Sequence, residues 1–152
     1  MTDQRRRNEQ ELITLINYVS RTYRKVVNRV LAARGLSDSQ AIPIIMIGRL
    51  GNGVRLGVLA EHVGVEVPSL VRQIDQLCAA GLVERRDDPS DRRAKSLHLT
   101  AEGRAQAAVI ETLFQELRGR MLWRVGEDEL ADAIKALRGF EEALAREDGD
   151  KG

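Results

Sequence analysis

The stretch that decides the fold spans residues 64–100 and reads GVEVPSLVRQIDQLCAAGLVERRDDPSDRRAKSLHLT. Between residues 67 and 78 its apolar side chains recur at steps of three and four, which predicts a helix with one buried face. Pro68 suits the first turn of this helix, and Gly81 suits the position just past its end, where a left-handed backbone is needed. The pattern changes after Gly81 from a helical period to a strand period.

The other face of this helix is polar. Its hydroxyl, guanidinium and amide groups also follow a helical spacing, and groups of these types hydrogen-bond the edges of bases. The candidate base-reading residues, including the proline of the first turn, are Pro68, Ser69, Arg72, Gln73 and Gln76.

A basic hairpin is predicted directly after the helix. Residues 82–86 and 94–99 are short enough to be strands, and residues 87–93 between them form a turn-rich run. A polar-faced helix followed by a basic-tipped hairpin is typical of a winged helix-turn-helix, whose helix enters the major groove while the hairpin reaches the backbone or the minor groove. The basic candidates of this wing are Arg85, Arg86, Arg92, Arg93 and Lys95.

The segments before this stretch complete the helix-turn-helix. Residues 55–63 are predicted to form a short helix, which the turn at Gly64 joins to the polar-faced helix. Further upstream, Ser37 and Gln40 resemble a capping box. Pro43 in the following apolar segment leaves two alternatives: the helix begins near Ile42, or it bends there.

Long amphipathic helices are predicted at both ends of the chain. The first covers residues 9–34, and at ~38 Å it is too long for one small lobe to bury. Thr100 caps a second, and a third covers residues 127–146. We therefore expect a mainly α (α+β) protein. Its expected parts are a winged helix-turn-helix lobe at 36–100, a helical dimerisation lobe from 9–35 and 101–146, and flexible tails at 1–8 and 147–152.

Composition excludes several classes. The chain has 152 residues and a net charge of +1. It contains one cysteine and two histidines, so neither a disulfide within the chain nor a zinc site is expected. No cofactor is predicted. The sequence lacks a phosphate-binding glycine loop and a nucleophile elbow, so we expect no enzyme. It also lacks an apolar run of about 18 residues. We expect a cytoplasmic protein that is bound to the nucleoid when it is bound to DNA.

The order of elements and two sequence words resemble the MarR family of bacterial regulators, and the SlyA branch most closely. The words are VGVEVPSLVRQIDQL, and GLVER followed by DPSDRRAKSLHLTAEG. The resemblance implies a homodimer that binds a pseudo-palindromic operator, as a repressor or counter-silencer. In many members a small phenolic or aromatic carboxylate releases the DNA. It also implies that Asp91 orients the wing and that Arg93 enters the minor groove, with Arg92 beside it.

Other residues have simpler interpretations. We interpret Cys78 as a small buried hydrophobe rather than a peroxide sensor, and the two histidines as surface or satisfied groups. The aromatic side chains of Tyr18, Tyr23 and Trp123 suit a core or a dimer interface better than an effector pocket, whose residues stay unassigned. The alternative function is a winged helix that binds proteins without sequence-specific DNA affinity.

Overall fold

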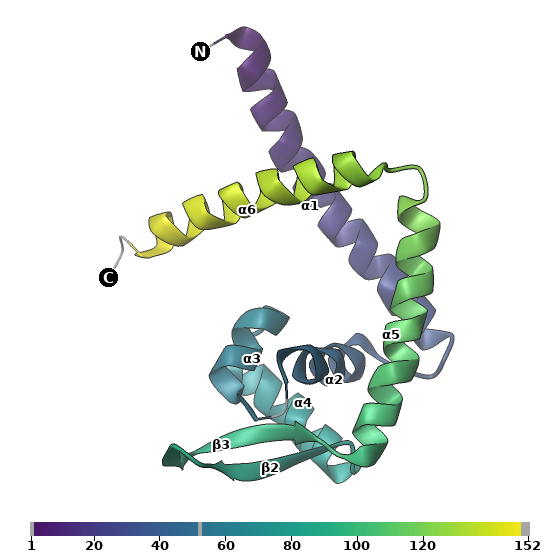
Figure 1. Ribbon diagram of the computed structural model, residues 1–152, viewed down its shortest axis with the longest axis vertical. Coiled ribbons are helices and arrows are strands. Elements are labelled where there is room, and N and C mark those ends of the chain that lie inside the picture. The colour runs from purple at the N-terminus through teal and green to yellow at the C-terminus, as the bar shows by residue number, and fades with distance from the viewer. Residues whose placement is uncertain (1, 52, 150–152) are drawn as a thin grey trace. The chain divides into compact units, whose positions relative to one another are not determined.

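The computed structural model describes residues 2–51 and 53–149, with Arg92 described by its backbone alone. Within these ranges the chain is mostly helical with one small antiparallel sheet, which confirms the predicted fold class (Figure 1). No helix there has the length and apolar character needed to cross a membrane. The elements are α1 (Asp3–Ala32), α2 (Asp38–Leu50), β1 (Val54–Arg55), α3 (Leu56–Val63), α4 (Val67–Ala79), β2 (Val83–Asp88), β3 (Asp91–Leu99), α5 (Ala101–Leu122) and α6 (Glu127–Gly149).

The chain divides into two compact units, Met1–Glu111 and Thr112–Gly152, with the boundary inside α5. In the first unit α2, α3 and α4 pack against one another, and α2 and α3 also contact β3. The helix-turn-helix and the hairpin therefore share one apolar core. Its fully buried side chains include Leu31, Ile44, Ile47, Leu59, Leu70, Ile74, Leu77 and Leu97.

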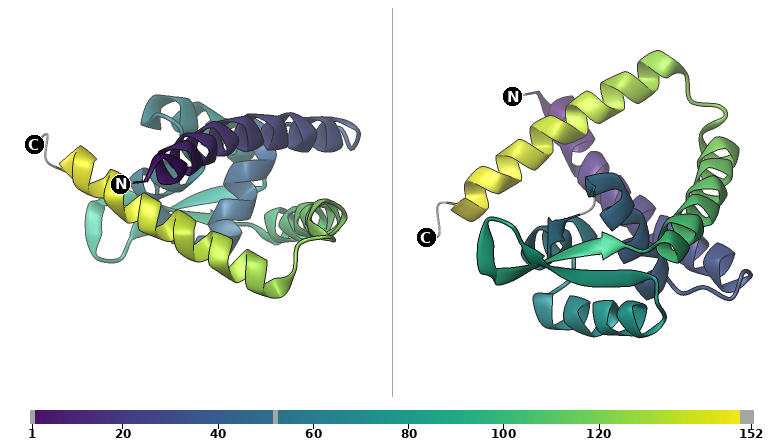
Figure 2. Two further views of the ribbon diagram at one scale, coloured as in Figure 1. Left: turned by 90° about the horizontal axis from the view of Figure 1, so that it is seen from above. Right: turned by 60° about the horizontal axis from the view of Figure 1, so that its bottom comes forward.

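The sheet has the strand order β1-β3-β2, and both pairings are antiparallel. The hairpin of β2 and β3, here called the wing, extends to a tip beyond α3 and α4 (Figures 1 and 2). Its strands are longer than predicted, because Asp88 pairs with Asp91 and leaves only Pro89 and Ser90 between the strands. The prediction of a loop over residues 87–93 was wrong. The strands at the exposed end of a hairpin can be polar throughout, so they lack the alternating apolar residues by which a strand is recognised.

Arg55 lies in a strand and not in the helix predicted for residues 55–63. Val54 and Arg55 pair with Leu97 and Ser96 of β3, and α3 begins one residue later. A two-residue strand is too short to show a period of two, so the sequence pattern could not separate it from the helix that follows.

The α2 helix runs through Pro43, which is buried inside it, so the helix does not begin near Ile42. Ser37 stands at the N-cap, but its hydroxyl donates to the side-chain oxygen of Gln40 at 3.1 Å. No side-chain cap bond to the backbone is formed, and the predicted capping box was wrong in that respect.

Both terminal helices extend further than predicted. Residues 3–8 belong to α1, where Arg5 pairs with Glu9 at 2.8 Å and Arg7 with Asp3 at 3.2 Å. The i,i+4 pairs favour helix where a tail was expected. Residues 147–149 likewise belong to α6. Met1 and residues 150–152 of the predicted tails lie outside the described residues.

In the second unit, the turn between α5 and α6 is closed by Glu129, whose carboxylate accepts from the Gly126 amide at 2.8 Å. No residue of α6 is buried within the described chain. Its apolar side chains Ile134, Leu137 and Leu144 are each about half exposed.

Candidate DNA-binding surface

The core fixes the orientation of α4. Leu70, Ile74 and Leu77 are at most 1% exposed, so the centre of the predicted stripe faces inward, whereas Val67 at its start is 43% exposed. The helix has its proline in the first turn, and the chain leaves it through Gly81, whose φ of 72° is left-handed as predicted. The opposite face of α4 therefore points away from the core.

The predicted reading residues of α4 divide by exposure. Pro68, Arg72 and Gln76 are exposed, whereas Ser69 and Gln73 are half-buried. The side-chain oxygen of Gln73 is buried and accepts no hydrogen bond from the described residues. Arg72 forms no ion pair with them, so its guanidinium is free to meet an external acceptor.

The basic wing residues differ in their partners. Arg85 lies 2.7 Å from the Asp75 carboxylate of α4, while Arg86 pairs with Glu84 and Lys95 with Asp87. These carboxylates offset part of the positive charge predicted for the wing.

Arg93 is exposed, and no described carboxylate pairs with it. Asp91 accepts a hydrogen bond from the Arg93 backbone amide at 3.0 Å, which fixes the backbone at the start of β3. The Arg92 side chain lies outside the described residues. The DNA contacts of all three remain predictions.

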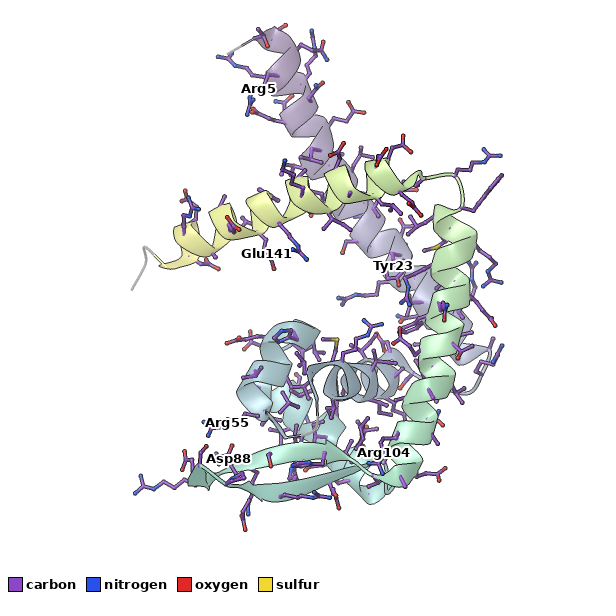
Figure 3. The ribbon with its side chains drawn as sticks, in the orientation of Figure 1. Arg5, Tyr23, Arg55, Asp88, Arg104 and Glu141 are labelled. Carbon is purple, nitrogen blue, oxygen red and sulfur yellow. The ribbon has the colours of Figure 1, made fainter. Side chains whose placement is uncertain are left out.

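Sequence reasoning missed a polar cluster at the wing tip (Figure 3). Arg55 Nε donates to Asp88 Oδ2 at 2.8 Å, and Arg55 Nη2 donates to Ser90 Oγ at 3.0 Å. The Ser90 hydroxyl and amide both donate to Asp88 Oδ1, at 2.6 and 2.9 Å. The bonds from Arg55 and Ser90 stabilise the charged carboxylate and hold the pKa of Asp88 well below its usual range. An arginine 33 positions upstream of its partner gives no local signal.

The base of the wing is joined to α5 by Thr100 and Gly103. The Thr100 hydroxyl accepts from the Gly103 amide at 3.0 Å, which confirms the predicted cap, and donates to Gly81 O at 2.7 Å. Gly103 is buried so closely that an added Cβ would lie 1.9 Å from Leu82 O. Arg104 donates to Leu99 O at 2.9 Å.

The other candidates that the sequence raised take ordinary positions. Cys78 is half-buried, and burial raises the pKa of its thiol against the opposing effect of nearby Arg85. Such a thiol is poorly nucleophilic at neutral pH. Tyr18 and Trp123 are exposed, at 56% and 71%, so neither lies in the core of its own unit.

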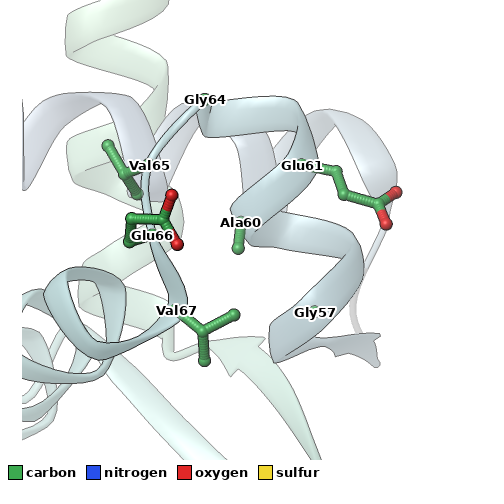
Figure 4. A pocket seen from close by; sticks show the side chains of 7 residues that line it. All are labelled: Gly57, Ala60, Glu61, Gly64, Val65, Glu66 and Val67. Carbon is green, nitrogen blue, oxygen red and sulfur yellow. The ribbon is translucent and has the colours of Figure 1, made fainter. Parts of the chain in front are cut away.

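A pocket of about 440 Å³ opens beside the turn between α3 and α4 (Figure 4). Its lining combines small and apolar residues with two carboxylates, Glu61 and Glu66. The carboxylates disfavour an anionic ligand, so this pocket does not suit an aromatic carboxylate.

The surface thus combines an outward polar helix with a projecting wing whose Arg93 has no carboxylate partner among the described residues. This arrangement is that of a winged helix-turn-helix DNA-binding protein. The model of the MarR family matches residues 34–94. A solved transcriptional regulator, PA3341, is 32% identical, with a TM-score of 0.83 over 89% of this chain and 98% of that one. This chain belongs to the MarR family of transcriptional regulators.

Two further solved structures have the same fold. A MarR-family transcriptional regulator from Silicibacter pomeroyi is 26% identical, with a TM-score of 0.71 over 83% of this chain and 84% of that one. CouR from Rhodococcus jostii RHA1, bound to p-coumaroyl-CoA, is 24% identical, with a TM-score of 0.77 over 87% of this chain and 92% of that one.

Proposed function

We propose that this chain is a homodimeric, sequence-specific DNA-binding regulator of a pseudo-palindromic operator. The observation that carries the proposal is the placement of two arginines without carboxylate partners among the described residues. Arg72 lies on the outward face of α4, and Arg93 lies on the wing. Uncompensated guanidinium groups are suited to DNA because binding releases condensed counterions.

The two arginines have different tasks in this proposal. Arg72, with Gln76 and the half-buried Ser69 and Gln73, reads base edges in the major groove. Arg93 enters the neighbouring minor groove, where a narrow A·T-rich segment has a strongly negative potential. Arg85, Arg86 and Lys95 are already paired, so they contribute mainly to the general attraction towards phosphates.

The proposed dimer is formed by the helical segments 9–35 and 101–146. Large apolar side chains stay exposed on these segments when the chain is considered alone, including Leu12, Leu15, Val19, Ile134, Leu137 and Leu144. Exposed apolar surface of this extent indicates an interaction site. A two-fold dimer then presents two copies of α4 about 34 Å apart, one turn of DNA.

Repression or counter-silencing, with release by a small phenolic or aromatic carboxylate, completes the proposal. It is supported by the wing word DPSDRRAK, on which the likeness to the SlyA branch also depends. CouR, which was solved with p-coumaroyl-CoA bound, shares the fold. The direct test measures whether salicylate raises the dissociation constant of the DNA complex in a concentration-dependent way.

The deciding experiment is the selection of bound sequences from random duplex DNA, followed by titration of the selected operator at several salt concentrations. We expect an inverted repeat, and an affinity that falls steeply as salt rises. A winged helix that only binds proteins would enrich no sequence. That result would refute the proposal in favour of the protein-interaction module.

A further inference from the structure

The cluster of Arg55, Asp88 and Ser90 is unlike the other ion pairs of the wing. Of the charged residues that the structure describes, Asp88 is the one that is buried, at 8% exposure. Both of its oxygens are used: Oδ2 by the Arg55 guanidinium, and Oδ1 by the hydroxyl and amide of Ser90. Arg55 also donates to the Ser90 hydroxyl, so the three side chains form a closed ring of hydrogen bonds.

The members of this ring come from two different parts of the DNA-binding lobe. Arg55 belongs to β1 and is also the N-cap residue of α3, the first helix of the helix-turn-helix. Asp88 ends β2, where the register of the hairpin shifts between Asp87 and Asp88, and Ser90 lies in the tip. Since β3 lies between β1 and β2, the ion pair of Arg55 and Asp88 joins the two outer strands of the sheet.

We propose that Arg55, Asp88 and Ser90 act as a clamp that fixes the wing tip relative to the helix-turn-helix, so that the minor-groove and major-groove contacts are made in one register. This inference rests on the proposed function. Arg55 and Asp88 are positioning residues here, and Arg93 is the residue that they place.

A second link between the wing and the helix-turn-helix lies near the other end of β2. Arg85 pairs there with Asp75 of α4, but both side chains are substantially exposed, at 36% and 55%. Exposed pairs contribute little to structural order. The Asp88 side chain is 9% exposed, and a guanidinium fork holds one geometry where a lysine would not. Arg55 is itself 46% exposed, so the difference lies in the carboxylate: of these two side-chain links, the tip clamp is the one with a buried acceptor.

The clamp makes a prediction opposite in sign to simple electrostatics. Asp88→Asn removes a negative charge near DNA, which by charge alone should strengthen binding. The clamp predicts weaker binding instead, because the freed tip no longer holds Arg93 in place. If Arg55 contacted DNA directly, the same variant would release its guanidinium and tighten the complex.

The test compares the intact wild-type protein with Asp88→Asn, Arg55→Gln, Arg55→Lys and Ser90→Ala. Each is titrated with the selected operator and with operators altered only in their A·T-rich flanks or only in their central bases. We expect Asp88→Asn and Arg55→Gln to lose affinity on the order of tenfold, with the preference for A·T flanks reduced and the central preference kept. Arg55→Lys and Ser90→Ala should fall between these variants and the wild type.

The matched control is Arg49→Gln. Arg49 is also an ion-paired arginine of similar exposure, 48% against 46% for Arg55, but its partner is Glu111 on α5. The Arg49→Gln variant loses the same charge as Arg55→Gln and should keep the preference for A·T-rich flanks. Circular dichroism checks folding, and Ser90→Ala removes only a hydroxyl if the charge variants are unstable.

Amide hydrogen exchange of Ser90 in the free protein gives a readout that does not depend on DNA. The clamp predicts slow exchange in the wild type and faster exchange in Asp88→Asn and Arg55→Gln. Unchanged exchange, or an Asp88→Asn protein that binds as tightly as wild type with its flank preference intact, would overturn the clamp. A wild-type protein that selects no sequence would instead refute the proposed function, while the exchange result still decides whether the clamp exists.

Discussion

The arginines of the DNA-binding surface differ in whether a carboxylate pairs with them, a difference that their positions in the sequence do not reveal. The residue pattern offered a run of basic residues around the wing, and only the resemblance to the MarR family singled out Arg93 among them. In the structure Arg85 and Arg86 have carboxylate partners, whereas Arg72 and Arg93 have none among the described residues. An arginine that must leave a carboxylate gains less from a phosphate or a base than one that leaves only water.

Arg93→Ala should therefore weaken operator binding more than Arg86→Ala does, although both remove one charge from the wing. Arg93→Ala should also reduce the preference for A·T-rich flanks, because a narrow minor groove attracts a guanidinium most strongly. Fluorescence anisotropy with flank-altered duplexes measures both quantities. Equal losses in the two variants, independent of flank sequence, would assign Arg93 a general phosphate role instead.

Arg72→Ala should cost about 1–3 kcal/mol of binding free energy and relax the preference at one operator position in each half-site. The guanidinium is exposed on α4, so its removal should leave the fold intact. Sequence selection with the variant identifies the relaxed position. A selected motif identical to that of the wild type would remove Arg72 from base reading.

Asp88 allows a prediction about pH. Its pKa is lowered in the folded protein, chiefly by the hydrogen bond from Arg55 and then by Ser90. The stabilisation that it contributes is therefore complete above the ordinary aspartate pKa of about 3.9, and is lost only as pH falls through the lower folded value. Carboxyl NMR titration should show Asp88 ionised throughout the range in which exposed aspartates protonate. In Arg55→Gln its midpoint should move up towards theirs.

At the scale of elements, the sequence predicted those parts that have a strong period. The α4 helix follows from its apolar stripe and from its proline and glycine signals, and the start of α5 follows from Thr100. The two-residue β1 could not be predicted, because it is defined by pairing with Leu97 and Ser96 about 40 positions later along the chain. For the same reason the Arg55 partner of Asp88 was missed.

The junction between the wing and α5 depends on Gly103. Its helical backbone needs no glycine, but a Cβ there would lie 1.9 Å from Leu82 O, which already accepts from the Thr100 amide at 3.1 Å. Gly103→Ala should therefore destabilise the protein by about 1–3 kcal/mol, as overpacking does. The measurement is urea unfolding followed by circular dichroism.

Gly119→Ala is the control in the same helix. An added Cβ at Gly119 meets no described atom within 4 Å. Since alanine favours helix over glycine, this variant should be more stable than wild type by about 0.5–1 kcal/mol. Equal destabilisation of the two variants would contradict both arguments: the close approach to Leu82 would not explain the loss in Gly103→Ala, and helix propensity would not predict the effect of Gly119→Ala.

At the scale of the whole molecule, the terminal helices carry more apolar surface than a single chain covers. Only Val27 and Leu31 of α1 are buried, both near its C-terminal end, while Leu15 and Val19 are 49% and 56% exposed. The sequence predicted this stripe, although α1 begins at Asp3 and not at residue 9 as expected. It could not give the geometry of a second copy, because nothing in one chain's periodicity specifies which surface of the partner meets the stripe.

Val19→Glu tests the dimer directly. A charge in the centre of the apolar stripe would have to be desolvated in the interface, so the variant should be monomeric where the wild type is dimeric. Thr14→Glu adds the same charge to the opposite face of α1 and should leave the dimer intact. Light scattering after size exclusion, over a range of concentrations, gives the molar mass of each.

The DNA affinity of these two variants separates assembly from recognition. A monomer keeps its own α4 and wing but loses the gain from binding two half-sites together, so Val19→Glu should lose roughly 10²- to 10⁴-fold in affinity for the inverted repeat. Its affinity for an isolated half-site should be close to that of one wild-type subunit. A monomeric Val19→Glu protein that binds the full repeat as tightly as Thr14→Glu would show that pairing of subunits contributes nothing to operator recognition.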